Sequence, residues 1–139
     1  MQIKTEMLAI QTKGPGDIID LTPKLKHILN KFGLTEGSVT VFNIGSTAGI
    51  TTIEFEPGLI KDMNKIYEKI APQKDTYHHH DTWGDYNGFS HCRASLQGPS
   101  LVIPYNNKEL LLGTWQQVVL MEFDDRPRSR KVIAQFMGY

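Results

Sequence analysis

Residues 77–93 hold most of the side chains in this sequence that could do chemistry. The run "YHHHDTWGDYNGFSHCR" contains four of the five histidines and the only cysteine of the 139-residue chain. Imidazoles titrate near neutral pH and bind divalent metals, so the stretch predicts an acid–base site or a metal site. The alternative is a polar loop that is merely rich in histidine.

Spacing limits how these histidines can cooperate. On a strand, neighbouring side chains point to opposite faces, so one pocket would receive His78 and His80 together, or His79 alone. His91 follows 11 to 13 residues later, and a folded-back loop would bring it close. Two imidazoles with a nearby carboxylate such as Asp85 would suit zinc or another divalent ion. The spacing matches no sharp zinc signature, so the metal and the polar loop both stay open.

Two acids and one small-residue turn are further candidates. Glu54 lies in the apolar-rich strand pattern "ITTIEFE", and Asp62 lies beside the apolar stripe of a predicted helix. Acids in such places often serve a site or form a buried pair, although a water-facing Glu54 is an equal alternative. "GSTAG" could offer the hydroxyls of Ser46 and Thr47 to a phosphate. It lacks the Gly-Lys-Ser/Thr of a P-loop, so a plain turn is favoured.

Hydrophobic periodicity predicts the elements that must position these residues. Alternation predicts strands over 2–12, 38–44, 50–56, 92–97, 100–104, 110–124 and 131–137. Helical spacing predicts helices over 22–32 and 57–70, the first with Thr22 as its N-cap. Residues 77–91 are expected to form a loop. Few helices and a cluster of strands near the end favour an α+β fold over a regular βαβ alternation.

Bulk composition narrows the class of protein. A chain of 139 residues fits one domain, residues 1–139. Fifteen basic and fifteen acidic residues cancel, which argues against a nucleic-acid partner. The N-terminus lacks a signal-peptide core and no run reaches membrane-spanning length, so we expect a cytoplasmic protein without a membrane partner. Cys92 alone cannot form an internal disulfide.

Three motifs in the second half resemble a known family. "RASLQGPSL" at 93–101, "GTWQQ" at 113–117 and "FDDRPRSR" at 123–130 occur in the order and spacing of the YjbQ-like family, also described as secondary thiamine-phosphate synthase enzymes. The first half matches more loosely, through "GSTAGITTIEFEPGLIKDM" and "YHHHDTWGDYNGFSH". The resemblance therefore covers nearly the whole chain.

The resemblance implies a fold, an assembly and a reaction. The family order is β2-α-β2-α-β3, with a seven-stranded β-sandwich and two helices, assembled as a homotrimer with a pocket at or near the subunit boundary. The implied activity is that of a thiamine-phosphate synthase, which joins a pyrimidine pyrophosphate to a thiazole phosphate. The expected partner is thus a phosphorylated small molecule.

The resemblance also implies a set of site residues. The expected catalytic residues are Glu54, Asp62, His79 and His91. The expected substrate contacts are Ser46, Thr47, Asp85, Asn87, Arg93 and Trp115. Among them, Asp85 and Arg93 would supply charge that the reaction could use. A divalent metal, zinc or magnesium, would be held by His79 and His91.

One departure from the family pattern leaves the chemistry open. Many members begin the small-residue turn with histidine, and this chain has Gly45. If that histidine is a metal ligand, then His78, His80 or Asp85 must replace it, or the site binds an anion without metal. The alternatives to a synthase are a non-enzymatic protein that binds a metal or an anionic metabolite, and a metal-assisted phosphoester hydrolase.

Overall fold

The computed structural model describes residues 1–139 as a mixed α+β fold, as predicted. The helices are α1 (Thr22–Phe32), α2 (Pro57–Ile70), α3 (His78–Trp83) and α4 (Gly88–Gln97). The strands are β1 (Gln2–Gln11), β2 (Ile18–Asp20), β3 (Gly37–Ile44), β4 (Ala48–Glu54), β5 (Ser100–Asn106), β6 (Glu109–Leu110), β7 (Gln116–Glu122) and β8 (Ser129–Gly138).

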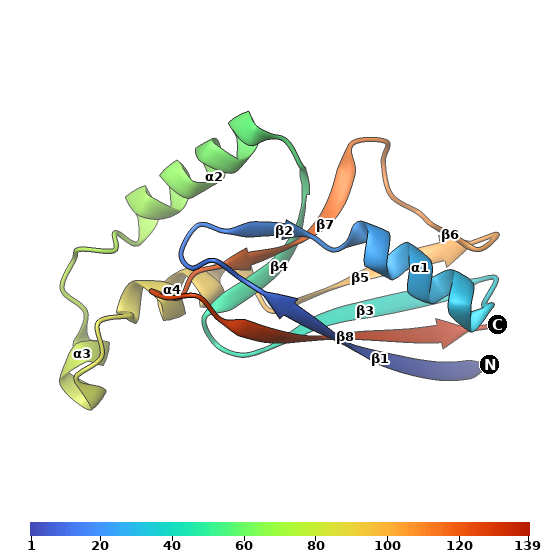
Figure 1. The fold of residues 1–139 in the computed structure, drawn as a ribbon, viewed down its shortest axis with the longest axis horizontal. Coiled ribbons are helices and arrows are strands. Elements are labelled where there is room, and N and C mark those ends of the chain that lie inside the picture. Colours follow the sequence, from blue (N-terminus) through green and yellow to red (C-terminus); the bar gives the residue numbers. More distant parts are fainter.

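The strands form two antiparallel sheets. The larger sheet has the order β1-β8-β3-β5-β6 and the smaller one the order β2-β7-β4. β1 and β8 pair along their whole length, from Gln2 opposite Gly138 to Gln11 opposite Ser129. This pairing brings the two chain termini to the same end of the molecule, and α3 lies at the other end (Figure 1).

Two hydrophobic clusters lie on opposite sides of the smaller sheet. Val118 and Leu120 of β7 face the main cluster, which fills the space between the two sheets and includes buried residues of α1. Val119 and Met121 face a second cluster, which α2 and α4 cover. Because β7 is buried on both faces, its run "VVLM" is continuously apolar rather than alternating.

Helix α1 starts one residue earlier than the capping rule predicts. Thr22 was expected as the N-cap, but that position belongs to Leu21. The Thr22 hydroxyl instead accepts a hydrogen bond from the Val118 backbone N–H at 2.8 Å, which ties the helix to β7. Gly33, at φ 68°, ends the helix as expected for a left-handed C-cap.

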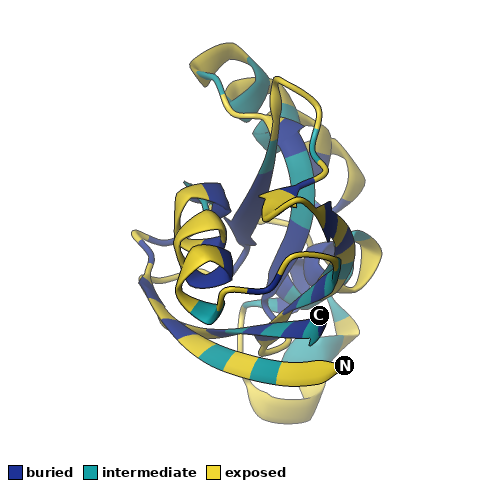
Figure 2. Ribbon diagram, turned by 90° about the vertical axis from the view of Figure 1, so that its right-hand side faces the viewer, coloured by how far each residue is buried: buried dark blue, intermediate teal, exposed yellow.

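Helix α2 is capped at its start and only partly buried along its length. The side chain of Glu56 caps its first turn by accepting hydrogen bonds from the Gly58 and Leu59 backbone N–H groups. Tyr67 is its only buried residue, and Ile66 and Ile70 of its apolar stripe are exposed. The helix therefore leaves these two side chains uncovered, and Figure 2 shows exposed and buried residues alternating along the helices.

The predicted counts of seven strands and two helices need correction. There are eight strands, of which β6 has two residues, and four helices. Residues 92–97 were predicted as a strand and 77–91 as a loop, yet α3 and α4 occupy this region. The buried face of α4 consists of Gly88, Phe89, Ser90, Arg93 and Ala94. These residues have helical spacing, but most are small or polar, so a hydropathy pattern does not reveal them. None of the four helices is long and apolar enough to span a membrane.

Candidate functional site

Helices α3 and α4 bring two of the predicted histidines together. The ring centroids of His79 and His91 lie 4.5 Å apart. The three consecutive histidines diverge because they lie on a helix, not on a strand. His78 is exposed, and the His80 ring packs against Tyr86 at 4.1 Å instead. Only His79 of the three faces His91.

Two glycines allow this arrangement. Gly84, at φ 71°, occupies the left-handed conformation that ends α3. Gly88 opens α4, and a Cβ atom there would lie 2.4 Å from the Cβ of Tyr77. Tyr77 is the residue before α3, and its hydroxyl donates a hydrogen bond to the Pro72 carbonyl at 2.6 Å. The start of α3 is therefore held closely against the start of α4.

The local environment keeps His91 neutral at pH 7. Burial lowers the pKa of His91 below its ordinary value, and the neighbouring His79 lowers it further. The negative charges of Asp124 and Asp85 oppose this shift without cancelling it. A neutral imidazole can accept a proton or a hydrogen bond, so His91 is suited to act as a general base.

Several polar atoms around the histidine pair have no partner. His79 Nε2, Asn87 Oδ1 and Ser90 Oγ are three of the five buried side-chain polar atoms without a hydrogen bond. Asn87 is the N-cap of α4, so it shares a helix face with Ser90 and His91, three and four residues later. Because buried polar atoms are nearly always paired, such a cluster is typical of a site that a ligand completes.

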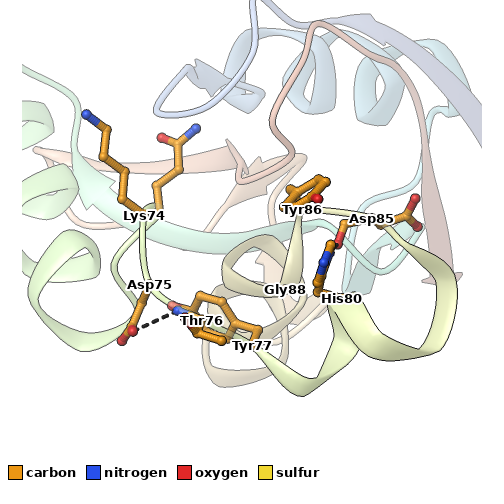
Figure 3. A pocket seen from close by; sticks show the side chains of 9 residues that line it. Lys74, Asp75, Thr76, Tyr77, His80, Asp85, Tyr86 and Gly88 are labelled. Carbon is orange, nitrogen blue, oxygen red and sulfur yellow. Dashed lines mark hydrogen bonds between the residues drawn. The ribbon is translucent and has the colours of Figure 1, made fainter.

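A pocket of about 350 Å³ opens on the other side of α3. It is lined by Gln73, Lys74, Asp75, Thr76, Tyr77, His80, Asp85, Tyr86 and Gly88 (Figure 3). Asp85 links this pocket to the histidine pair. Its carboxylate lies 4.0 Å from His79 Nε2, and its carbonyl oxygen lies 3.1 Å from His80 Nδ1. The pocket and the histidine pair therefore form neighbouring parts of one polar region.

A buried ionic network lies beside the site. Glu122 and Arg130, 1 % and 4 % exposed, form an ion pair between the end of β7 and the start of β8. The Glu122 carboxylate also accepts hydrogen bonds from the Thr12 hydroxyl at 2.7 Å and the Asp124 backbone N–H at 3.1 Å. Arg130 donates to the Thr47 hydroxyl at 2.8 Å. Every charge in this pair is thus matched by several partners, as a buried charge requires.

Asp124 connects this network to the site. Its carboxylate, in a residue 1 % exposed, accepts hydrogen bonds from the Asn87 amide at 3.3 Å and the Thr47 hydroxyl at 3.3 Å. It also pairs with Arg128 at 2.8 Å. The NH₂ group of Asn87 therefore bonds to the network, and the carbonyl oxygen of the same amide has no partner.

The structure gathers four of the ten residues expected at the site. His79, His91, Asp85 and Asn87 lie together on α3, α4 and the segment between them. Thr47 reaches this group only through Asp124, because its hydroxyl is already engaged in the buried network. Ser46 lies exposed in the turn between β3 and β4.

Arg93 has a structural role in the chain. It was expected on a strand, but it lies on α4 and is 5 % exposed. Its guanidinium donates hydrogen bonds to Glu68 at 2.7 Å and to the Ala71 carbonyl at 2.9 Å, and it lies 5.0 Å from the Phe89 ring. These contacts attach α4 to the end of α2 and leave little of the cation free for a substrate.

Glu54, Asp62 and Trp115 lie apart from the histidine pair. Glu54 is the exposed last residue of β4, about 20 Å along the strand from the end where Thr47 meets Asp124. Asp62 is exposed on α2, and Trp115 is 71 % exposed just before β7. No hydrogen bond or ion pair joins any of the three to His79 or His91, so one chain does not assemble the four expected catalytic residues.

The residues present do not complete a metal site within one chain. Nowhere do three histidine, cysteine, aspartate or glutamate side chains converge as an ion would require. His79 and His91 supply two imidazoles, and Asp85 lies close to only one of them. Position 45 offers no further ligand, because Gly45 has no side chain.

Sequence reasoning overlooked Ser90, Glu122, Asp124 and Arg130, and a signal existed for one of them. The alternation in β7 places Glu122 on the same face as Val118 and Leu120, and a carboxylate there must be buried and paired. A charged run such as 126–130 beside Asp124 and Asp125 is typical of a solvated turn. Nothing in its composition distinguishes the buried Asp124 from the exposed Asp125.

The fold and site define an α+β protein with two antiparallel sheets and a polar, histidine-containing region on two short helices. Comparison with known proteins identifies the family. The model of the UPF0047 protein YjbQ-like family matches residues 6–139. A UPF0047 protein from Methanothermobacter thermautotrophicus is 33% identical over 138 residues, which cover 99% of this chain and 94% of the relative. YugU from Bacillus subtilis is 33% identical over 132 residues, which cover 94% and 97%. The chain belongs to the YjbQ-like family.

Solved structures agree with this assignment. A YbjQ-like protein from Sulfolobus solfataricus superposes with a TM-score of 0.88 at 26% identity, covering 99% of this chain and 100% of that one. A YjbQ/UPF0047 family protein from Clostridium acetobutylicum gives a TM-score of 0.86 at 33% identity, covering 95% and 99%. The names of these relatives state the family and no reaction.

Proposed function

We propose that this protein is an enzyme that binds a small phosphorylated substrate beside His79 and His91, with neutral His91 accepting a hydrogen bond from the substrate. The observation that carries the proposal is the cluster of unpartnered buried polar atoms around the two imidazoles. In a purely structural histidine pair, such atoms are expected to be paired with the protein or with ordered water. Lys74, in the adjoining pocket, would supply positive charge for a phosphate group.

The reaction we favour is the thiamine-phosphate synthase type that the family resemblance suggests. In it, the bond between the pyrimidine methylene carbon and the pyrophosphate oxygen breaks, and the thiazole nitrogen forms a new bond to that carbon. The pyrophosphate leaves with the bonding electron pair, so positive charge develops on the pyrimidine. The carboxylates of Asp85 and Asp124 make the region beside His91 favourable for such charge.

An assay with both substrates tests the proposal and separates it from its alternatives. The wild-type protein should form coupled product, and His91→Ala should lose about tenfold in turnover, the value of one hydrogen bond to a charged group. Substrate binding without product would support a binding protein. Phosphate release from one substrate alone, dependent on added Zn²⁺ or Mg²⁺, would support a hydrolase and a metal cofactor.

We further propose that the protein forms the trimer that the resemblance implies, through the outer face of the larger sheet. Apolar residues on that face are 40–62 % exposed: Ile3, Met7, Phe42, Ile44 and Val102. Met7, Ile133 and Phe42 lie side by side across three strands. A zero net charge offers no long-range repulsion between copies. A second copy would bury this face.

Assembly would also offer a place for the remaining expected residues. Glu54 and Asp62 are exposed in one chain, so they are available to a neighbouring copy. Sedimentation equilibrium should give a mass of three chains, and Met7→Glu with Phe42→Glu should reduce it to one. A monomeric wild-type protein would refute the assembly. The cytoplasmic location stays a prediction that cell fractionation tests.

A further inference from the structure

The buried carboxylate of Asp124 determines which end of the Asn87 amide faces the histidine pair. Four donors point at this carboxylate: the Asn87 amide, the Thr47 hydroxyl, the Asp125 backbone N–H at 2.9 Å and the Arg128 guanidinium. Burial alone would raise the pKa of Asp124, but the hydrogen bonds and the charge of Arg128 together bring that pKa below its usual value. The group is therefore ionised at neutral pH.

An ionised carboxylate only accepts hydrogen bonds, so Asn87 must direct its NH₂ group at Asp124. The carbonyl oxygen of the same amide, Oδ1, then has no partner and is buried. It cannot exchange places with the NH₂ group without setting two oxygens against each other. The orientation of this amide is thus fixed by Asp124.

The negative charges near the histidine pair also favour a hydrogen-bond donor over an anion. The Asp85 carboxylate lies 4.0 Å from His79 Nε2, and the charges of Asp85 and Asp124 both act on His91. Arg128 and Arg93 are already engaged in ion pairs, with Asp124 and with Glu68. An incoming phosphate oxygen could accept only from the Ser90 hydroxyl and the imidazoles and would meet two negative charges, whereas an N–H donor would meet Asn87 Oδ1 and favourable charge.

We propose that Asp124 is a positioning residue that holds Asn87 Oδ1 toward the histidine pair, and that the ligand group bound there is an organic N–H donor such as an ammonium, an amidinium or a ring amino group. This inference rests on the proposed substrate site and adds that the part of the site beside Asn87 binds a hydrogen-bond donor. The phosphate of the substrate would then lie elsewhere, toward Lys74. Because three protein ligands do not converge, an organic donor fits better than a metal ion.

The test measures binding of acetamidinium, inorganic phosphate and Zn²⁺ by changes in the side-chain ¹⁵N resonances of His79 and His91. Acetamidinium should perturb both rings in the wild-type protein. Asp124→Asn has the same shape but lets Asn87 rotate, so acetamidinium affinity should fall about tenfold, the value of one hydrogen bond to a charged group. Asp125→Asn removes the same charge from an exposed neighbour and should leave the affinity within about twofold of wild type.

A second measurement needs only the wild-type fold. The Asn87 side-chain NH₂ signals, assigned by their loss in Asn87→Ser, should exchange with solvent slowly because Asp124 holds them. Exchange at the rate of a free amide would overturn the inference, as would phosphate or Zn²⁺ perturbing the rings while acetamidinium does not. If acetamidinium binds equally to wild type and Asp124→Asn, the site stands and the role of Asp124 fails. If no probe moves either ring, the substrate site itself fails, and this inference with it.

Discussion

The buried ionic network and the histidine pair lie next to each other but differ in how completely their polar atoms are paired. Glu122 and Arg130 are almost fully buried, and each carboxylate oxygen of Glu122 accepts at least two hydrogen bonds. The histidine pair is partly exposed, and three buried polar atoms on or next to the same two helices have no partner: His79 Nε2, Asn87 Oδ1 and Ser90 Oγ. The first arrangement is complete and stabilises the fold, whereas the second is incomplete and is available to a ligand. Asp124 and Asn87 join the two.

The largest expected effect is in the network. Glu122→Ala leaves Arg130 as a buried, unpaired charge, so the free energy of unfolding should fall by about 3–5 kcal/mol. The matched control is Glu6→Ala, which removes the surface ion-pair partner of Lys31 and should cost about 0–1 kcal/mol. Urea unfolding of both variants gives the comparison. Equal losses of unfolding free energy would show that the buried network contributes no more to stability than a surface ion pair.

Arg93→Met should have the next largest effect. The substitution keeps apolar bulk against Phe89 but removes the hydrogen bonds to Glu68 and the Ala71 carbonyl. We expect a loss of about 1–3 kcal/mol in unfolding free energy, because the bonds involve a charged group but Glu68 is half exposed. Substrate affinity should not change beyond what unfolding explains. A stable variant with lost affinity would instead assign Arg93 to the substrate.

Some of the elements and site residues can be predicted from the sequence, and others depend on contacts that only the folded chain makes. Strands β1, β3, β4 and β8 and helices α1 and α2 follow from their periodicity and end signals, and the fold class follows from their order. The family resemblance, not the spacing of the histidines, points to His79, His91 and Asn87. Helix α4 escapes prediction because Ser90 and Arg93 face inward, so its buried side is polar. The burial of Asp124 depends on Thr47 and Arg128, which only the tertiary fold brings near.

A smaller effect should appear in the pH dependence of stability. Because the pKa of His91 is lowered in the folded protein, the unfolded chain binds a proton between that lowered value and 6.5 while the folded chain does not. Stability should therefore fall as the pH decreases through this window, and His91→Gln should weaken the dependence. Unfolding free energies at pH 7.5 and 5.5 measure it. His27→Gln, on the exposed side of α1, is the control and should retain the wild-type dependence.

The smallest expected effects on stability are at the exposed acids. Glu54→Gln and Asp62→Asn should each change the unfolding free energy by less than about 0.5 kcal/mol, since neither side chain has a partner in the chain. The effect of these two substitutions on turnover distinguishes a site shared between copies from a site within one chain. A large loss of turnover in the assembled protein would indicate that a neighbouring copy supplies these acids. Unchanged turnover would confine the site to α3, α4 and their surroundings.

The most direct test of a complete network beside an incomplete site compares two buried hydroxyls. Thr47→Val removes a hydroxyl that is bonded to both Arg130 and Asp124, and Ser90→Ala removes one that has no partner. In urea unfolding of the ligand-free protein, Thr47→Val should lose about 1.5–3 kcal/mol, and Ser90→Ala should lose nothing or become slightly more stable. A loss of about 1 kcal/mol or more in Ser90→Ala would mean that its hydroxyl is already paired in the folded protein, and would contradict the account of an incomplete site.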